Sequence, residues 1–124
     1  MKKDGIDIQE RAFQFASRVL QMDDRLSQNG RINRRAMNQL VDAAMSVGAN
    51  LEEAKGAHSR ADFHSKVRIS LKEARESHYW LRIISESSKL PSSRFAPLIQ
   101  EANELISILT TIAKKTNPRN PANS

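Results

Sequence analysis

The residues of this chain best suited to chemistry are basic ones that repeat along one predicted helix, Ser59 to Ser88. At about 100° per residue, one side of that helix collects His64, Arg68, Lys72, Arg75, Tyr79 and Arg82, which we call the basic stripe. Cations at this spacing can follow a phosphate backbone, and a tyrosine among them can stack on a base. Arg34 and Arg35, at the start of the preceding helix, would extend this surface. The stripe therefore indicates sequence-independent contact with nucleic acid.

The stripe has a second interpretation, as a solvated helix face held by local ion pairs. Three pairs have the i,i+4 spacing that such contacts need: Asp62–Lys66, Lys72–Glu76 and Arg82–Glu86. The excess of 20 Lys and Arg over 14 Asp and Glu does not decide the matter, because many basic proteins bind no nucleic acid. Both interpretations stay open from the sequence.

The carboxylates and histidines form no recognisable catalytic or metal site. Di-iron bundles need Glu-x-x-His on two helices, and the sequence lacks that motif. His78 follows Glu76 by two residues, which places it off the side of the helix that carries Glu73 and Glu76. The glycines are isolated, so there is no phosphate-cradling loop, and the absence of Cys excludes a thiol nucleophile. We expect no enzyme activity, no metal and no cofactor.

A polar set spans the second and third predicted helices. It consists of Ser46, Asn50 and Glu53 on the second and Glu73 and Glu76 on the third. One interpretation is a polar pocket between the helices. The other is a hydrogen-bonded network with Lys55 or Arg75 that fixes the register of the two helices, because buried polar groups must be satisfied.

Four amphipathic helices would position these residues. We predict helices from Asp7 to Asn29-Gly30, from near Asn33 to Lys55, from Ser59 to Ser88, and from Ser92 or Ser93 to about residue 115. Asp7, Ser59 and one of the two later serines are the expected N-caps. Short connections make consecutive helices antiparallel, and no stretch alternates with period two. The prediction is an all-α, up-down-up-down antiparallel four-helix bundle without a sheet.

Apolar spacing assigns the buried faces of these helices. The third helix presents a seam of Phe63, Val67, Ser70, Ala74, Ser77, Leu81 and Ile84, and Phe13, Ala16 and Leu20 are expected to widen the buried face of the first. Gly48 lies on the buried side of the second helix. A glycine there costs about 1 kcal/mol relative to alanine, so we expect a close backbone approach, to Ser70, Ala74 and Ser77.

Trp80 lies with Ile69 and Ile83 on the flank of the third helix, between the seam and the basic stripe. This aromatic residue either completes the core or belongs to a subunit interface, where Trp is enriched.

Length and composition indicate one domain. We predict a flexible N-terminus over residues 1–6, the bundle over 7–115 and a disordered tail over 116–124. The first residues lack the apolar region of a signal peptide, and no apolar run approaches the ~20 residues of a membrane span. We expect a cytoplasmic protein without a membrane partner.

A family resemblance covers Gln39 to Ile84. Its elements are Ser46-x-Gly48-Ala49-Asn50-Leu51-x-Glu53-Ala54, Asp62-Phe63, Ser70-Leu71-x-Glu73-Ala74-x-Glu76 and Tyr79-Trp80-Leu81. This block resembles the bacterial four-helix bundle proteins, also called intervening-sequence proteins because some are encoded within insertions in large-subunit ribosomal RNA genes. Many members have proline where Gly48 stands, and this chain resembles the glycine-bearing branch.

The resemblance implies more than the composition does. It implies a bundle assembled into a ring-shaped homopentamer with a basic surface, and it suggests association with nucleic acid, RNA above all. It does not imply an enzyme activity. Its motif residues Gly48, Asn50, Glu53, Ser70, Glu73 and Glu76 would then be structural. The accessory subunit of the reverse transcriptase of diversity-generating retroelements is a related basic pentamer. The alternative is therefore a protein-binding scaffold or a reverse transcriptase accessory subunit.

Overall fold

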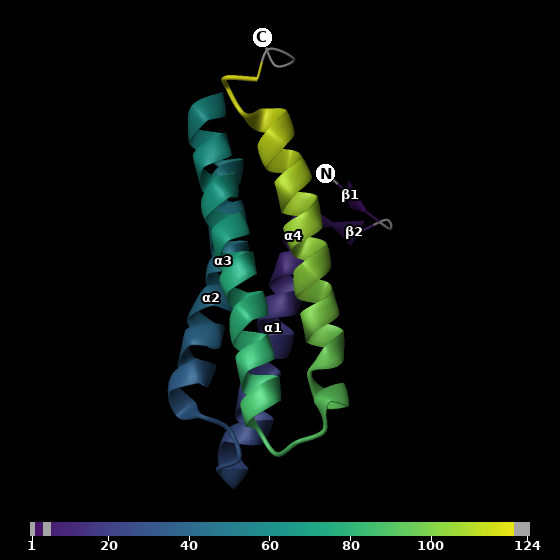
Figure 1. The fold of residues 1–124 in the computed structure, drawn as a ribbon. Coiled ribbons are helices and arrows are strands. Elements are labelled where there is room, and N and C mark those ends of the chain that lie inside the picture. The colour runs from purple at the N-terminus through teal and green to yellow at the C-terminus, as the bar shows by residue number, and fades with distance from the viewer. Residues whose placement is uncertain (1, 4–5, 121–124) are drawn as a thin grey trace.

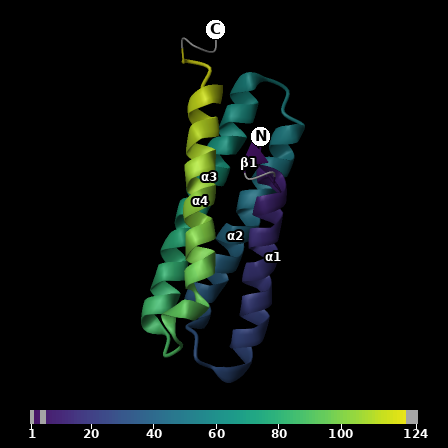
Figure 2. The same ribbon diagram turned by 90° about the vertical axis from the view of Figure 1, so that its right-hand side faces the viewer.

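The fold is an antiparallel bundle, as Figure 1 shows for a computed structural model of the chain that describes residues 2–3 and 6–120. Its long helices are α1 (Ile8–Leu26), α2 (Arg34–Lys55), α3 (Arg60–Ser87) and α4 (Ala96–Thr116). They alternate in direction, and α1 and α3 each pack against both α2 and α4 (Figure 2). The predicted four-helix bundle is confirmed.

Side-chain caps start three of the helices. Asp7 accepts a hydrogen bond from the Gln9 N–H at 3.0 Å, which caps α1. Asn33 Oδ1 accepts from the Ala36 N–H at 3.1 Å, and Ser59 Oγ accepts from the Asp62 N–H at 3.0 Å. Each of these oxygens satisfies one of the amide groups that a helix leaves unpaired at its N-terminus. The predicted starts of the first three helices are confirmed.

The start of α4 corrects the prediction that Ser92 or Ser93 caps it. Ser92–Arg94 instead form a short 3-10 turn (η2), and α4 begins at Ala96 after Phe95, which provides no side-chain cap. Pro97 lies in the first turn, where its missing N–H removes no helical hydrogen bond. Phe95 is fully buried, so packing rather than capping fixes this end.

Both chain ends differ from their sequence-based description. The strands β1 (Lys2–Lys3) and β2 (Ile6–Asp7) pair antiparallel, although no sheet was predicted, because two-residue strands give no period-two pattern. Thr116, predicted as the first residue of a disordered tail, is the last residue of α4, and residues 117–120 form a turn after it. The rest of both predicted segments, residues 1, 4–5 and 121–124, lies outside the described residues.

The core follows the predicted seams with one exception. On α3, the buried side chains are Val67, Ser70, Ala74, Ser77, Leu81 and Ile84, with Phe63 half-buried beside them. On α1, however, Phe13 is 67% exposed and Leu20 is 44% exposed. The prediction that these two widen the buried face of α1 is wrong, because α1 needs only the narrower Ile8-to-Leu26 seam to cover α2 and α4.

Two serines lie fully buried in the α3 seam. Ser70 Oγ donates to the Val47 carbonyl of α2 at 2.8 Å, and Ser77 Oγ donates to the Glu73 carbonyl of its own helix at 2.8 Å. Burial of a hydroxyl costs free energy unless it is hydrogen-bonded, and both hydroxyls are satisfied. The small serines therefore let α2 and α3 pack closely, and Ser70 fixes their register.

Gly48 faces a different helix from the one predicted. A Cβ built on Gly48 would lie 3.7 Å from the backbone carbonyl carbon and oxygen and from the Cβ of Ala12. The close approach is therefore between α2 and α1, and the predicted contact with Ser70, Ala74 and Ser77 is wrong. Spacing along α2 located the close contact but carried no information about which neighbouring helix makes it.

This geometry predicts opposite effects for two substitutions of Gly48. Gly48→Ala should preserve or raise stability by up to about 1 kcal/mol, because 3.7 Å is an ordinary contact distance and alanine favours the helix. Gly48→Leu should cost about 1–3 kcal/mol, because its longer side chain meets the α1 backbone. Thermal unfolding of both variants checks this, and equal melting temperatures for the two would contradict the close approach.

Candidate nucleic-acid interface

The four cations of the basic stripe are exposed along the outer side of α3. They are Arg68, Lys72, Arg75 and Arg82, and the Tyr79 side chain among them is 51% exposed. Among the described residues, none of the four takes part in an ion pair. Since α3 rises ~1.5 Å per residue, they span about 21 Å of helix.

The local ion pairs of the alternative interpretation do not form in the described part of the chain. Lys66 contacts Glu53 of α2, with Nζ 2.8 Å from Oε1, although Asp62 is one turn away on its own helix. Glu76 accepts a hydrogen bond from the Trp80 indole N–H at 3.1 Å and makes no ion pair with Lys72. Unpaired charge on the stripe favours an external anionic partner over a self-neutralised face.

Arg34 and Arg35 differ in whether their charge is paired. Arg34 Nη1 lies 2.8 Å from Asp23 Oδ1, so its charge is paired across α1 and α2. Arg35 is exposed and lines a groove of about 620 Å³ with Trp80 and Ile83 of α3. Arg35 can therefore extend the stripe near its Arg82 end, whereas Arg34 stabilises the α1–α2 contact.

The predicted polar network between α2 and α3 does not form as a unit. Asn50 Nδ2 donates to the Ser46 carbonyl of its own helix at 2.8 Å. Glu53 pairs with Lys66 rather than with Lys55 or Arg75, and Lys55 contacts Glu52. This Glu53–Lys66 ion pair and the Ser70–Val47 hydrogen bond fix the register that the network was expected to fix.

The environment of Glu73 opposes its negative charge. Partial burial is the main cause that raises the pKa of Glu73, the nearby Glu76 carboxylate adds to it, and Lys72 partly offsets both. A carboxylate with a raised pKa binds its proton more tightly in the folded chain than in the unfolded one. The stability from this difference is present below the ordinary pKa and is lost as pH rises through the raised value.

Glu73→Gln should therefore stabilise the fold at neutral pH, where the wild-type carboxylate is charged. We expect a gain of about 0.5 kcal/mol, kept small because the group is partly solvated. The gain should vanish at a pH below the ordinary pKa of Glu73, where wild type is protonated too. Denaturant unfolding at both pH values measures it, with Glu86→Gln, an exposed change on the same helix, as the control. A loss of stability at neutral pH would contradict the prediction.

Apolar side chains flank the stripe, and two of them, Trp80 and Ile83, line the groove shared with α2. Trp80 is half-buried, and Ile69 and Ile83 are each 38% exposed. The Tyr79 and Trp80 rings meet edge to face, with centroids 5.1 Å apart and planes at 77°. Trp80 packs against the core, so it both contributes to the core and reaches the surface groove.

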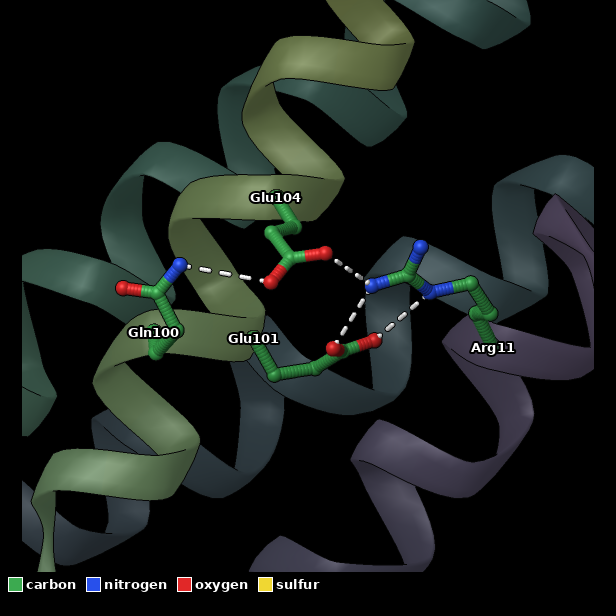
Figure 3. A network of polar contacts seen from close by, with 4 residues as sticks. All are labelled: Arg11, Gln100, Glu101 and Glu104. Carbon is green, nitrogen blue, oxygen red and sulfur yellow. Dashed lines mark hydrogen bonds and ion pairs between the residues drawn. The ribbon is translucent and has the colours of Figure 1, made fainter. Parts of the chain in front are cut away.

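The most buried charge in the described structure, shown in Figure 3, was not predicted from the sequence. Arg11 of α1 is 8% exposed and makes a bidentate contact with Glu101 of α4: Nε lies 3.0 Å from Oε2 and Nη2 lies 2.7 Å from Oε1. Nη2 also lies 2.9 Å from Glu104 Oε1, and Gln100 donates to the other Glu104 oxygen at 3.2 Å. Hydrogen bonds to Glu101 and then Glu104 raise the pKa of Arg11 despite its burial.

One sequence signal pointed to this cluster. Arg11 stands three residues after Ile8 and four before Phe15, so it shares the apolar face of α1. A charge on a buried face needs a partner of opposite charge. Glu101 and Glu104 stand one before Ala102 and Leu105, at the edge of the α4 seam.

The histidines outside the stripe and the remaining carboxylates are spread over the described part of the chain. Within the described residues, no three His, Cys, Asp or Glu side chains gather as a metal site would require. His64 Nδ1 lies 3.3 Å from Thr116 Oγ1, and burial together with Arg82 lowers the pKa of His78.

None of the helices in residues 2–3 and 6–120 has the length and apolar character needed to cross a membrane.

Comparison with known proteins places this geometry in a family context. Residues 4–111 match the model of the 23S rRNA-intervening sequence protein. Among solved structures, the chain is similar to a protein of unknown function from the S23 ribosomal protein family of Bacteroides thetaiotaomicron VPI-5482. The two are 29% identical, the match covers 87% of this chain and 99% of that one, and the TM-score is 0.81. No match was found among curated proteins.

Proposed function

Because this chain belongs to the 23S rRNA-intervening sequence protein family, we propose that it is a non-enzymatic helical bundle that associates with nucleic acid, RNA above all. The basic stripe on α3 is the proposed contact surface. Its cations would bind phosphates, and Tyr79 would stack on an unpaired base.

The observation that carries this proposal is the unpaired state of the stripe. A cation that already has a carboxylate partner gains little from a phosphate, because it must exchange one ion pair for another. Arg68, Arg75 and Arg82 have no ion-pair partner among the described residues, whereas Arg34 and Lys66 do. The net charge of +6 favours approach of a polyanion to this surface.

Salt dependence of RNA binding tests the proposal. Four phosphate contacts to a single strand predict a slope of about −3 for log affinity against log salt concentration. Fluorescence anisotropy with a labelled single-stranded RNA measures the slope, and the matching DNA strand measures the preference for RNA. Absence of binding at low salt would overturn the proposal, and a slope near zero would show that phosphate contacts do not drive it.

We also propose that the protein forms a homo-oligomeric ring, a pentamer as the family resemblance implies. An odd-numbered ring requires two different surfaces on each subunit, because each contact is head to tail. Large exposed apolar side chains occur on more than one helix: Phe13 and Leu20 on α1, Met45 on α2, and Ile69 and Ile83 on α3. Since α1 and α3 occupy diagonal positions in the bundle, the apolar side chains on these two helices can serve as the two surfaces.

The oligomer has its own test. Light scattering should give about 70 kDa, which is five times the 14.0 kDa of one chain. Phe13→Glu should reduce the mass without unfolding the chain, because the Phe13 side chain is 67% exposed. A 14.0 kDa wild type would overturn the ring. A reverse transcriptase partner, the alternative implied by the resemblance, stays a prediction.

A further inference from the structure

A pocket lies at one end of the basic stripe, between the first turns of α3 and the turn that follows α4. Its volume is about 560 Å³, and its polar lining consists of His64, Ser65, Arg68, Asn117 and Arg119, with Ile69 and Pro118 as apolar walls. No Asp or Glu is among these lining residues. Arg68 belongs to the stripe, whereas Arg119 lies in the segment for which the sequence predicted no structure.

Hydrogen bonds hold the Arg119 turn against the end of α4. The Arg119 N–H donates to Asn117 Oδ1 at 3.0 Å, and the Asn120 N–H donates to the Asn117 carbonyl at 3.0 Å. Asn120 Nδ2 donates to the Lys114 carbonyl at 3.0 Å, which satisfies one of the acceptors that a helix leaves open at its C-terminus. The turn is therefore a fixed part of the pocket wall.

A separate contact fixes the orientation of His64. The Thr116 hydroxyl donates to the Ile112 carbonyl at 2.7 Å, so its proton is already used. Thr116 Oγ1 must then accept from the His64 Nδ1–H, 3.3 Å away, so Nε2 of the neutral ring is an acceptor and donates to a phosphate only in the imidazolium form. The pocket thus combines two guanidinium groups from separate elements, an imidazole and a serine hydroxyl.

This combination fits a phosphate monoester better than a backbone diester. Two guanidinium groups can share a group that carries about −1.5 to −2 at neutral pH, whereas an internal diester carries a single charge. Arginine is also suited to phosphate because its planar fork donates two parallel hydrogen bonds. A pocket of this volume at the end of a stripe suits the terminus of a strand whose remaining phosphates follow Lys72 and Arg75.

We propose that this pocket binds the terminal phosphate monoester of a nucleic-acid strand, with Arg68 and Arg119 sharing its charge. The inference rests on the proposed nucleic-acid binding and adds a preference for a phosphorylated end. Arg119 is its diagnostic residue, because Arg119 lies outside the stripe and lines the pocket.

The test compares three single-stranded RNAs of about eight nucleotides, with a 5′-phosphate, a 3′-phosphate or hydroxyls at both ends. One phosphorylated end should bind wild type about tenfold tighter than the hydroxyl strand. Arg119→Ala should abolish that preference while leaving affinity for the hydroxyl strand unchanged. Lys115→Ala, which removes an exposed charge from the last turn of α4 outside the pocket, should keep the preference.

A second measurement separates this inference from the proposed function. Titration with a nucleoside 5′-monophosphate, followed by NMR of the His64 ring, probes the pocket without a strand. A shift in wild type that is lost in Arg119→Ala supports the pocket even if no RNA binds, in which case the stripe proposal alone fails. Equal affinities for all three RNAs, or a preference that survives Arg119→Ala, would overturn the pocket while leaving the stripe intact.

Discussion

Replacing Arg11 with alanine should cost the fold about 2–3 kcal/mol and lower the melting temperature by roughly 8–15 °C. The stability is lost because the two carboxylates that contact Arg11 would remain without their partner. Glu101, with a side chain 18% exposed, would lose both bonds of a bidentate contact, and Glu104 would lose its 2.9 Å contact. An uncompensated carboxylate in a partly buried site is costly, and the exposure of Glu104 keeps the loss below that of a fully buried pair. Thermal and denaturant unfolding measure the effect.

Three further variants identify the cause. Arg11→Lys should recover only part of the stability, because an ammonium cannot reproduce the bidentate contact. The triple replacement Arg11→Met, Glu101→Leu and Glu104→Leu should be far less destabilised than Arg11→Ala, because it leaves no charge unpaired. Arg18→Ala removes an exposed arginine from the same helix and should have almost no effect. If Arg18→Ala and Arg11→Ala destabilised the chain equally, the cluster would not be the cause.

Local features of the structure could be predicted from the sequence because they depend on neighbours along the chain. Asp7 and Ser59 cap helices through hydrogen bonds to residues two or three positions away, and the sequence contains both partners. The α3 seam follows from helical periodicity alone, including its buried Ser70 and Ser77. The predicted cap of α4 was wrong because packing replaced capping at Phe95, and α1 ends at Leu26, before the predicted Asn29-Gly30.

Features that depend on the relative placement of helices could not be predicted in the same way. Periodicity put Gly48 and Arg11 on buried faces but did not say that Gly48 meets Ala12 or that Arg11 meets Glu101. The same limit explains Lys66, which contacts Glu53 across α2 and α3. An i,i+4 pair contributes only about 0.2–0.5 kcal/mol, so a well-placed carboxylate on another helix easily replaces it.

The candidate site was accordingly predicted in part. The residues of the basic stripe follow from spacing along one helix, and the structure places all four cations on its exposed side. Lys72 lacks its expected partner because Glu76 accepts a hydrogen bond from Trp80, a preference that helical periodicity does not predict. The role of Arg119 in the pocket was not predicted, because hydrogen bonds with the end of α4 hold its turn. A tail rich in Pro and Asn gives no sequence pattern that predicts such bonds.

Reversing two charges of the stripe should weaken RNA binding about 100-fold. Arg68→Glu with Arg75→Glu removes two phosphate contacts and puts two carboxylates in their place, at roughly 1.4 kcal/mol or more for each site. The net charge falls by four, from +6 to +2. Both side chains are exposed and unpaired among the described residues, so the fold should keep its melting temperature. Anisotropy titration at fixed salt measures the loss.

A matched charge reversal elsewhere decides whether the stripe or the net charge is responsible. Arg18→Glu with Arg25→Glu makes the same change of four charges on α1, where both arginines are exposed. Long-range attraction depends on total charge and would fall equally in both variants, whereas direct phosphate contacts are lost only where they are made. The α1 variant should therefore bind RNA within a few-fold of wild type and keep its slope of log affinity against log salt concentration. In the α3 variant, that slope should become shallower by the contribution of about two phosphate contacts. Equal losses of affinity in both variants would mean that the stripe acts only through the net charge of the protein. RNA would then have no defined site on α3.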